Sequence, residues 1–416
     1  MDAAKTTRDG TTAPARGSAT SDAISPSAEL GIYIQVPFCQ TKCTYCNFHT
    51  GVAARSLYAP YARAIEREIS EHAALYRAAG LEHAVLTAQS AAIDTIYLGG
   101  GTPSLLDPAD LARIIGAVHA QFPCALREVT LEADPETIRP DNAAAWLAAG
   151  IHRISLGVQS FQDAELAAAG RMHRCEDIGR AICVLRSAGF SNLSVDLIAG
   201  LPHQTPRSWT SSVEQLLSLR PEHTSIYLLE VDEGSRLGSE VLAGGSRYSA
   251  AAIPDDDVMA ACYEQACAEL ATAGYEHYEI SNWALSGLAS RHNLKYWRRQ
   301  PYLGFGAGAH SFDGRWRWAN AHDAAKYVAA IAAGRLPIEQ CAELSRADAL
   351  EEEMFLGLRQ LAGIDLARIE QQYGVDFGPR IATLCAQGLV ECTGTRVRLA
   401  PARLTVSNEV FVALLD

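Results

Sequence analysis

The chain contains 416 residues, of which 48% are hydrophobic and 20% are charged, and its formal net charge is −13 at pH 7. Such a composition is typical of a globular protein, and the length allows two or three units around a substantial core. The acidic balance argues against a bulk nucleic-acid binder, so we expect no nucleic-acid partner. No stretch approaches the ~18 apolar residues that a membrane span requires, so we expect no stable membrane insertion.

The N-terminal residues 1–30 are rich in Ala, Ser, Thr and Asp and lack an apolar signal-peptide core. We expect them to form a disordered tail. Of the eleven cysteines, three cluster at the spacing of metal ligands. We interpret the other eight as buried free thiols, which suits the reducing environment of a cytoplasmic protein. They are Cys124, Cys175, Cys183, Cys262, Cys267, Cys341, Cys385 and Cys392.

A loop with three cysteines follows the first predicted strand, which a proline ends. Cys39, Cys43 and Cys46 stand in a C-x3-C-x2-C pattern. Thiolates are soft ligands, and three so close together indicate one polynuclear iron site or one zinc ion. With only three thiolates, one iron of a 4Fe–4S cluster would stay open to a small molecule. The alternative is a structural zinc held by the same cysteines and His49.

Strand and helix patterns alternate through residues 31–235. Alternation implies a parallel sheet, because each crossover must pass over one face of the sheet. Six such units over about 200 residues favour an α/β fold of the incomplete (β/α)6 TIM-like barrel type, with ligands beyond the carboxyl ends of the strands. After the first strand, we predict strands at residues 93–98, 128–132, 152–156, 193–198 and 224–228. Helices are predicted at about residues 57–79, 109–121 and 208–219, and two further helical runs are predicted to end at Gly150 and Gly189.

The remaining chain is expected to form two further regions. Residues 236–345 are less regular, contain a predicted helix at 255–273, and would cap the barrel as an α+β region. Residues 346–416 are predicted as three helices followed by short strands at 397–400 and 404–406, a winged-helix-like domain. This segment carries ten acidic and seven basic residues, without a basic recognition face. We therefore predict a packing or partner module rather than a DNA-binding domain.

Several polar motifs follow predicted strands and should therefore meet at one rim of the barrel. The glycine turn at residues 99–103 allows a ligand to approach the backbone closely. Glu132 ends a strand, where a carboxylate could bind ribose hydroxyls or an amino group. Gln159, Arg171 and Asp196 could together hold a second polar ligand, although solvation at the surface explains each of them individually.

The segment His292-Asn293-Leu294-Lys295-Tyr296-Trp297 (HNLKYW) combines an imidazole with two aromatic rings. Haem needs an axial ligand such as His and a flat apolar wall for the macrocycle. His292 could supply the ligand, and Tyr296 and Trp297 the wall. The alternative is a buried histidine with a structural role. Further along the chain, we expect the glycine-rich stretch 304–310 to line a cavity as a loop.

The cysteine loop resembles the signature of the radical S-adenosylmethionine superfamily, in which the cofactor occupies the open iron. With the motifs GGGTPS, LEADPET, ISLGVQSF, DLIAGLP and HNLKYW, the chain is similar to the family of oxygen-independent coproporphyrinogen III oxidases and their paralogues, the HemW haem chaperones. The resemblance runs from about residue 31 to the C-terminus.

This resemblance implies a 4Fe–4S cluster on the three cysteines, with S-adenosylmethionine bound to it. The residues that would lie near this cofactor are Tyr33, Tyr45, Gly100 and Glu132. A second adenosyl site of the oxidases would correspond to Gly101, Thr102, Gln159, Arg171 and Asp196.

Two features resemble the chaperone branch more than the oxidases. The oxidases have a further cysteine two residues after the third, and here that position is Phe48. The HNLKYW segment is similar to the H-N-x-x-Y-W motif of the chaperone branch, which is linked to haem binding. Two positions depart from the family pattern. His310 stands where the oxidases have an apolar residue near the first cofactor, and Gln35 stands where many members have a histidine.

The resemblance therefore implies a haem chaperone that binds haem, a 4Fe–4S cluster and S-adenosylmethionine, and transfers haem to acceptor haemoproteins. An electron donor for the cluster would be a further partner. The alternative is an enzyme of the oxidase branch, which decarboxylates the propionates of coproporphyrinogen III by radical chemistry.

Overall fold

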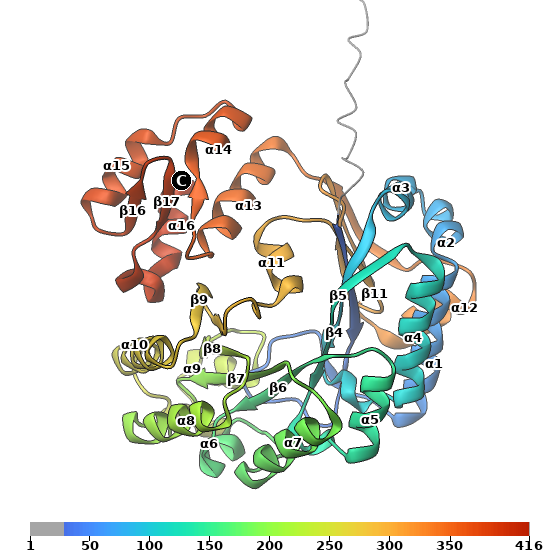
Figure 1. Cartoon of the computed structure of the whole chain (residues 1–416), viewed down its shortest axis with the longest axis horizontal. Coiled ribbons are helices and arrows are strands. Elements are labelled where there is room, and N and C mark those ends of the chain that lie inside the picture. The colour runs from blue at the N-terminus through green and yellow to red at the C-terminus, as the bar shows by residue number, and fades with distance from the viewer. Residues whose placement is uncertain (1–28, 416) are drawn as a thin grey trace, which may run out of the picture.

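The computed structural model describes residues 29–415. The predicted tail, residues 1–30, lies outside this part except for Glu29 and Leu30, which begin strand β1 (Glu29–Val36). β1 belongs to a curved sheet with the strand order β14-β13-β12-β11-β1-β4-β5-β6-β7-β8-β10-β9 (Figure 1). The strands after β1 are β4 (Ala92–Gly100), β5 (Cys124–Ala133), β6 (Arg153–Gln159), β7 (Leu193–Ala199) and β8 (His223–Leu228).

The strands from β1 to β8 in this order are parallel, and helices connect them. Further strands extend the sheet at both edges. In the part of the chain that is described, the end strands β14 and β9 do not pair with each other, so the sheet stays open. The predicted α/β fold with an incomplete (β/α)6 TIM-like barrel is confirmed. The edge strands are β11 (Tyr302–Phe305), β12 (His310–Phe312), β13 (Trp316–Asn320), β14 (Ile338–Glu343), β10 (Asn282–Ala284) and β9 (Glu276–Glu279).

Strand β4 illustrates why these segments pack with one apolar and one polar face. Side chains alternate along a strand. Ile96 and Leu98 are fully buried in the hydrophobic core, whereas Thr95 and Tyr97 point to the opposite side and form hydrogen bonds there. The concave face of the sheet is therefore polar, and it can hold a site with ionisable groups.

Helices cover the convex face of the sheet (Figure 1). The predicted helix at 57–79 is interrupted at Glu71, whose backbone (φ −99°, ψ 16°) is not helical, and it forms α1 and α2. Helix α3 was not predicted, because its amphipathic pattern is weak. The helices between β1 and β8 are α1 (Tyr58–Ser70), α2 (His72–Ala78), α3 (Glu82–Ser90), α4 (Pro108–Gln121), α5 (Pro140–Ala148), α6 (Asp163–Ala168), α7 (Cys175–Ala188) and α8 (Pro206–Leu219).

The region after β8 contains α9 (Arg236–Leu242), α10 (Asp256–Thr272), α11 (Arg291–Trp297) and α12 (Ala324–Ala332). Asp255 caps α10, as the predicted helix at 255–273 requires. The prediction that the stretch 304–310 is a loop is wrong. It forms the end of β11, a short turn and the start of β12, because β11 pairs in parallel with β1.

The C-terminal region contains a small sheet with the strand order β15-β17-β16 among helices, a winged-helix-like arrangement (Figure 1). The predicted strands at 397–400 and 404–406 are partly wrong. The hairpin is formed by β16 and β17 around Gly394, and residues 404–406 belong to a 3-10 helix. The elements are α13 (Arg346–Leu358), β15 (Ile364–Asp365), α14 (Leu366–Tyr373), α15 (Gly378–Ala386), β16 (Val390–Thr393), β17 (Arg396–Leu399) and α16 (Ser407–Leu415).

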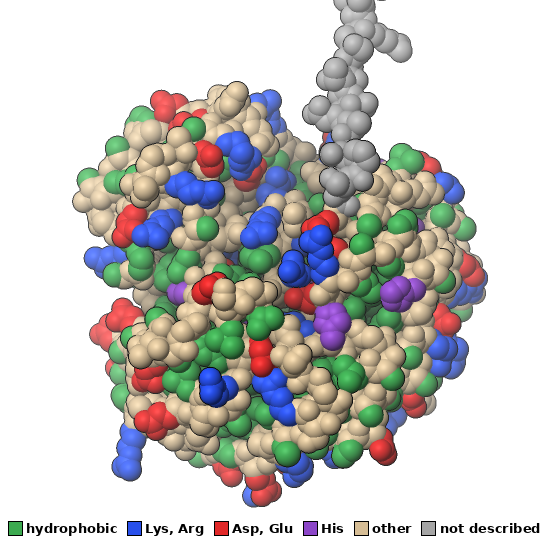
Figure 2. Space-filling model, viewed as in Figure 1, with side chains coloured by type: hydrophobic (Ala, Val, Ile, Leu, Met, Phe, Trp, Pro, Cys, Tyr) green, Lys and Arg blue, Asp and Glu red, His purple; other side chains and the backbone are tan. Residues whose placement is uncertain are grey.

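The cysteines outside the loop correct another prediction. Cys262 is buried, whereas Cys183, Cys341 and Cys392 are exposed. The burial of β16 does not alternate along the strand: Cys392 is exposed although it lies on the same face as the buried Val390. Figure 2 shows acidic and basic side chains interspersed over one face of the molecule. Within residues 29–415, the helices are all too short or too polar to cross a membrane.

Candidate cofactor site

The three clustered cysteines lie in the loop after β1, where β2 (Phe38–Cys39) pairs with β3 (Gly51–Val52). They line a cavity of about 490 Å³ at the carboxyl ends of the parallel strands. The structure brings most of the predicted site residues to this cavity, as the parallel topology requires. Those that line it are Cys39, Cys43, Tyr45, Cys46, Gly100, Gly101, Thr102, Glu132, Gln159, Arg171 and Asp196.

The glycine turn after β4 is fixed directly to the strand that leads into the cysteine loop. The backbone N–H of Gly101 donates to the carbonyl of Val36 at 2.8 Å, and that of Thr102 donates to the carbonyl of Phe38 at 2.7 Å. A Cβ atom on Gly101 would lie 2.5 Å from the carbonyl oxygen of Phe38. Only glycine therefore allows the turn and the cysteine loop to approach so closely.

Glu132 points from the end of β5 toward the glycine turn. Its carboxylate accepts hydrogen bonds from the hydroxyl of Tyr97 at 2.8 Å and from the backbone N–H of Gly100 at 3.0 Å. Burial raises the pKa of Glu132 to about 7. A carboxylate with such a pKa becomes fully charged when a cationic group, such as an amine, binds beside it.

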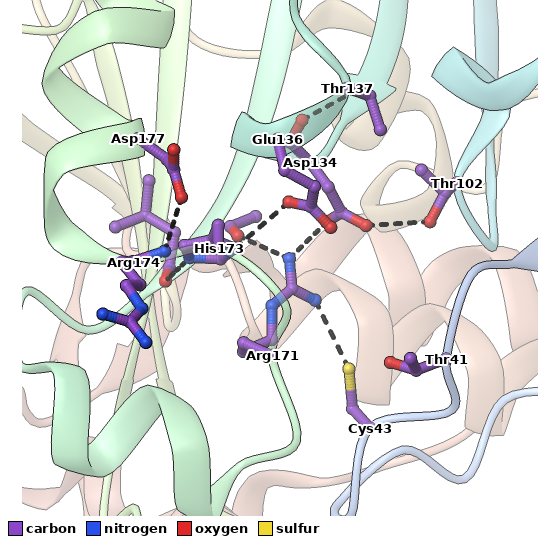
Figure 3. Close-up of polar contacts among 12 residues, drawn as sticks. Thr41, Cys43, Thr102, Asp134, Glu136, Thr137, Arg171, His173, Arg174 and Asp177 are labelled. Atoms are coloured by element: carbon purple, nitrogen blue, oxygen red, sulfur yellow. Dashed lines mark hydrogen bonds and ion pairs between the residues drawn. The ribbon is translucent and has the colours of Figure 1, made fainter.

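Arg171 connects the cysteine loop to the ends of β5 and β6 (Figure 3). Its guanidinium forms an ion pair with Asp134 and donates to Cys43 Sγ at 3.4 Å and to the carbonyl of Gly157 at 2.7 Å. Asp134 also accepts a hydrogen bond from the Thr102 hydroxyl at 2.9 Å. Asp134 was not among the predicted site residues, although it lies in the LEADPET motif two residues after Glu132.

Gln159 and Asp196 complete the cavity on the side of β6 and β7. Gln159 ends β6 with a φ of 68°, a left-handed conformation that is uncommon for a residue other than glycine. Asp196 accepts hydrogen bonds from Ser155 and Ser194, both at 3.4 Å. Burial raises the pKa of Asp196 above its ordinary value.

Tyr33 and Gln35 lie beside the cavity on β1. Tyr33 does not line the cavity, and its hydroxyl donates to Gln35 Oε1 at 2.7 Å. The amide group of Gln35 lies against Gly100, since a Cβ atom there would be 2.4 Å from Gln35 Nε2. Gln35, which stands where many family members have a histidine, thus packs against the glycine turn. His310 is exposed and does not line the cavity either.

The HNLKYW segment forms α11, which lies on the concave side of the sheet (Figure 1). His292 is fully buried outside the cavity lining, with Nδ1 2.9 Å from Thr95 Oγ1 and Nε2 2.9 Å from the Tyr296 hydroxyl. Burial lowers the pKa of His292 to about 3. Both ring nitrogens are therefore engaged, and the imidazole is neutral.

Three buried charged side chains, those of Glu128, Asp94 and Lys295, hold α11 against the sheet. Glu128 on β5 accepts hydrogen bonds from the backbone N–H groups of Arg291 at 2.9 Å and His292 at 3.1 Å, at the beginning of the helix. Lys295 Nζ lies 2.7 Å from Asp94 Oδ1, and both side chains are almost fully buried. These contacts with β4 and β5 were not predicted from the sequence, because nothing local marks Asp94 or Glu128 as partners of a helix so far along the chain.

The donor set of the cysteine loop fits an iron–sulfur cluster better than a single zinc ion. A zinc site needs all its donors about 2.0–2.3 Å from one ion, whereas a cluster spreads its ligands over several irons. The ring of His49, the fourth zinc ligand of that alternative, lies against the ring of His322 with centroids 3.9 Å apart.

Comparison with known proteins places the chain in a family. Residues 33–216 match the radical SAM superfamily, and residues 344–402 match the HemN C-terminal domain. A heme chaperone HemW from Bacillus subtilis is 32% identical over 92% of this chain and 98% of that protein. The chain belongs to the HemW family. Another HemW, from Mycobacterium tuberculosis, is 34% identical over 94% of this chain and 96% of that protein.

This member of the HemW family shares its fold with a solved enzyme. The structure of coproporphyrinogen III oxidase (HemN) from Escherichia coli aligns with a TM-score of 0.76 and 23% sequence identity, over 94% of this chain and 91% of the enzyme. This similarity establishes the fold. Phe48 stands where the resemblance predicts a further cysteine in the oxidases, and its side chain is 66% exposed.

Proposed function

We propose that this protein is a haem chaperone that binds haem, holds a 4Fe–4S cluster with S-adenosylmethionine, and transfers haem to acceptor haemoproteins in the cytoplasm. The observation that carries the proposal is the identity of 32% to a haem chaperone over 98% of that protein's length. The cavity supports it, because three thiols, a glycine turn and a buried carboxylate face one space.

In this proposal, Cys39, Cys43 and Cys46 are the ligands of the cluster. Once reduced by an electron donor, the cluster would supply one electron for the cleavage of S-adenosylmethionine. Gly100 and Glu132 would lie beside the amino group of the cofactor, since the Gly100 N–H holds the acceptor carboxylate of Glu132 at the rim. The residues that would surround the rest of the cofactor, or a second adenosyl group, are Tyr33, Tyr45, Gly101, Thr102, Gln159, Arg171 and Asp196.

Haem would bind at α11, with His292 as the axial ligand and with Tyr296 and Trp297 as aromatic contacts. Since Nε2 of His292 is 2.9 Å from the Tyr296 hydroxyl, iron ligation through Nε2 requires Tyr296 to give up this hydrogen bond. The proposal thus includes a local rearrangement of α11 when haem binds.

Titration of the anaerobically purified protein with haem, followed by the Soret absorbance, tests the proposal. We expect binding of about one haem per chain and a large loss of affinity in the His292→Ala, Tyr296→Ala, Trp297→Ala variant. His223→Ala is a matched control, because His223 is equally buried and its two ring nitrogens contact Ser194 and Tyr278. Wild-type affinity in the triple variant would remove the assignment of α11.

The second candidate is an oxygen-independent coproporphyrinogen III oxidase, and the shared fold with that enzyme supports it. Anaerobic incubation with coproporphyrinogen III, dithionite and S-adenosylmethionine separates the two candidates. Formation of the decarboxylated product would overturn the chaperone proposal. Haem binding without turnover would support it.

A further inference from the structure

The cavity extends beyond the predicted site residues to the opposite edge of the parallel strands. Tyr227 at the end of β8, Ser281 between β9 and β10, and Arg359 after α13 line this part, which we name the β8–β9 wall. The sequence did not single out any of these three residues. Arg359 is the residue that the C-terminal region contributes to the cavity, so the site includes both regions that match family models.

Backbone hydrogen bonds hold Arg359 in place at the edge of the large sheet. The N–H of Ile280 donates to the carbonyl of Arg359 at 3.1 Å, and the N–H of Leu361 donates to the carbonyl of Tyr278 at 3.2 Å. The segment 359–361 therefore runs beside β9 like a short additional strand. Its position in the cavity follows from the sheet rather than from a flexible loop.

The side chain of Arg359 also contacts the HNLKYW segment. Its guanidinium carbon lies 4.6 Å from the centroid of the Trp297 ring, a cation–π arrangement. Helices α11 and α13 are in contact, and the side chain of Gln360 donates to the carbonyl of Trp297 at 3.2 Å. Arg359 thus links the cavity with the end of α11.

The charge of Arg359 is only weakly paired within the protein. Its nearest carboxylate oxygen, Glu279 Oε2, is 3.5 Å from Nη2, and the buried Nε has no hydrogen-bond partner. Glu279 is itself shared, because it also accepts hydrogen bonds from Asn282 and from the backbone N–H of Ser281. A guanidinium presents five N–H donors in a planar fork that matches a carboxylate. Within the described residues the guanidinium donates only from Nη2 to Glu279, so the two N–H groups of Nη1 remain for a ligand.

The cavity is lined by four carboxylates and by two cationic side chains besides Arg359. The carboxylates are Glu132, Asp134, Asp196 and Glu230, and the cations are Arg171 and Lys42, whose Nζ donates to the Phe48 carbonyl at 3.4 Å. Glu132, Asp134 and Asp196 make the β5–β7 side acidic. Arg171 on that side is already engaged by Asp134, by the carbonyl of Gly157 and by Cys43. Leu228 and Leu229 add an apolar surface to the cavity. An apolar ligand with carboxylate groups fits this distribution of charge.

We propose that Arg359 recognises a carboxylate of the cargo, namely a propionate group of the tetrapyrrole. This inference rests on the proposed haem chaperone function. The guanidinium pairs with the propionate inside the cavity, and its contact with Trp297 orients the macrocycle relative to α11. Tetrapyrroles without free propionates are therefore poor ligands.

The experiment compares iron protoporphyrin IX with its dimethyl ester, which has the same macrocycle without the two charges. Soret titrations of the cluster-loaded protein measure both affinities. For the wild type, we expect the free acid to bind about tenfold or more tightly than the diester, as a charge-assisted pair requires. In Arg359→Gln, this preference should fall to about twofold or less. Arg359→Lys should retain part of it, because the charge remains and the fork is lost.

Arg298→Gln is the matched control, since Arg298 also contacts Gln360 but is exposed and does not line the cavity. It should keep the wild-type preference. If Arg359→Gln does not fold, the wild-type comparison can still overturn the inference, and Arg359→Lys still tests the assignment to Arg359. Two results would overturn the inference about Arg359 and leave the chaperone function standing. One is equal binding of the free acid and the diester by the wild type, and the other is a full preference for the free acid in a folded Arg359→Gln protein. Binding of neither porphyrin by the wild type would overturn the chaperone function and this inference with it.

Discussion

The backbone N–H of Gly100 donates a hydrogen bond to the carboxylate of Glu132 at 3.0 Å, which joins the turn after β4 to the end of β5. The two residues are adjacent only because neighbouring parallel strands end at the same rim. This bond and the one from Tyr97 hold a carboxylate with a pKa of about 7 at the edge of the cavity.

The first prediction concerns this carboxylate. We expect Glu132→Gln to weaken S-adenosylmethionine binding about tenfold or more, because a hydrogen bond to a charged group contributes ~1.5–3 kcal/mol. Anaerobic calorimetry on the reconstituted protein measures the affinity, and the cluster absorbance should be unchanged. Tyr97→Phe should have a smaller effect, since it removes only a hydroxyl. Unaltered affinity in Glu132→Gln would show that the carboxylate does not contact the cofactor.

The second prediction concerns the close packing of β1 against α11. A Cβ atom at Gly31 would lie 3.0 Å from Lys295 Cδ and 3.2 Å from His292 Cε1. We expect Gly31→Ala to lower the free energy of unfolding by ~1–3 kcal/mol, since the buried side chains must shift. Gly116→Ala in α4 is the control. It has free space and should stabilise the protein by ~0.5–1 kcal/mol. Urea unfolding measures both, and equal effects would contradict this account.

The third prediction concerns the buried ion pair between Asp94 and Lys295, whose charged atoms are 2.7 Å apart. Lys295→Met should lower the free energy of unfolding by ~3–5 kcal/mol, because it leaves a buried carboxylate without its partner. The double variant Asp94→Asn, Lys295→Met should recover most of this loss. A double-mutant cycle by chemical denaturation measures the coupling. Additive effects of the two substitutions would argue against a direct interaction.

The fourth prediction concerns pH and the buried Glu68 on α1. Its carboxylate accepts hydrogen bonds from Tyr327 at 2.5 Å and Gly306 at 3.0 Å, and burial raises its pKa from 4.5 to about 7. The folded state therefore binds this proton more tightly than the unfolded state. Its contribution to stability is fully present below pH 4.5 and is lost as the pH rises to about 7.

Accordingly, the free energy of unfolding of the wild type should fall more steeply over this pH range than that of Glu68→Gln, by ~1–3 kcal/mol in total. Urea unfolding at several pH values measures this difference. Subtracting the two curves removes the contributions of other titrating groups. Parallel curves would mean that Glu68 stays charged in the folded protein throughout this range.

The fifth prediction concerns two thiols in the C-terminal region. Cys385 Sγ on α15 and Cys392 Sγ on β16 are 2.8 Å apart, and Cys392 is exposed. We expect a mild disulfide oxidant, such as oxidised glutathione, to accept two electrons and two protons from this pair and leave a disulfide between them. Mass spectrometry after alkylation detects the bond, and Cys385→Ser should abolish it. Alkylation of both thiols after oxidation would contradict the prediction.

The sequence by itself determined the cysteine loop, the alternation of strands and helices, and the rim where the polar motifs meet. These are local signals. Thiol spacing, the period of apolar residues and the glycine turn each need only a few neighbouring positions. Once the strands are parallel, their carboxyl ends share one edge, so residues as distant as Cys39 and Asp196 line one cavity.

Only the tertiary structure decided which side chains pair across that rim and how α11 is held. The pairing of Arg171 with Asp134, the two hydrogen bonds of His292 and the position of Arg359 all join segments far apart in the chain. No local pattern encodes such contacts, because each depends on how strands and helices pack after they form. The C-terminal hairpin shows the same limit at short range. Its turn at Gly394 was missed because the strand pattern on either side is only four residues long.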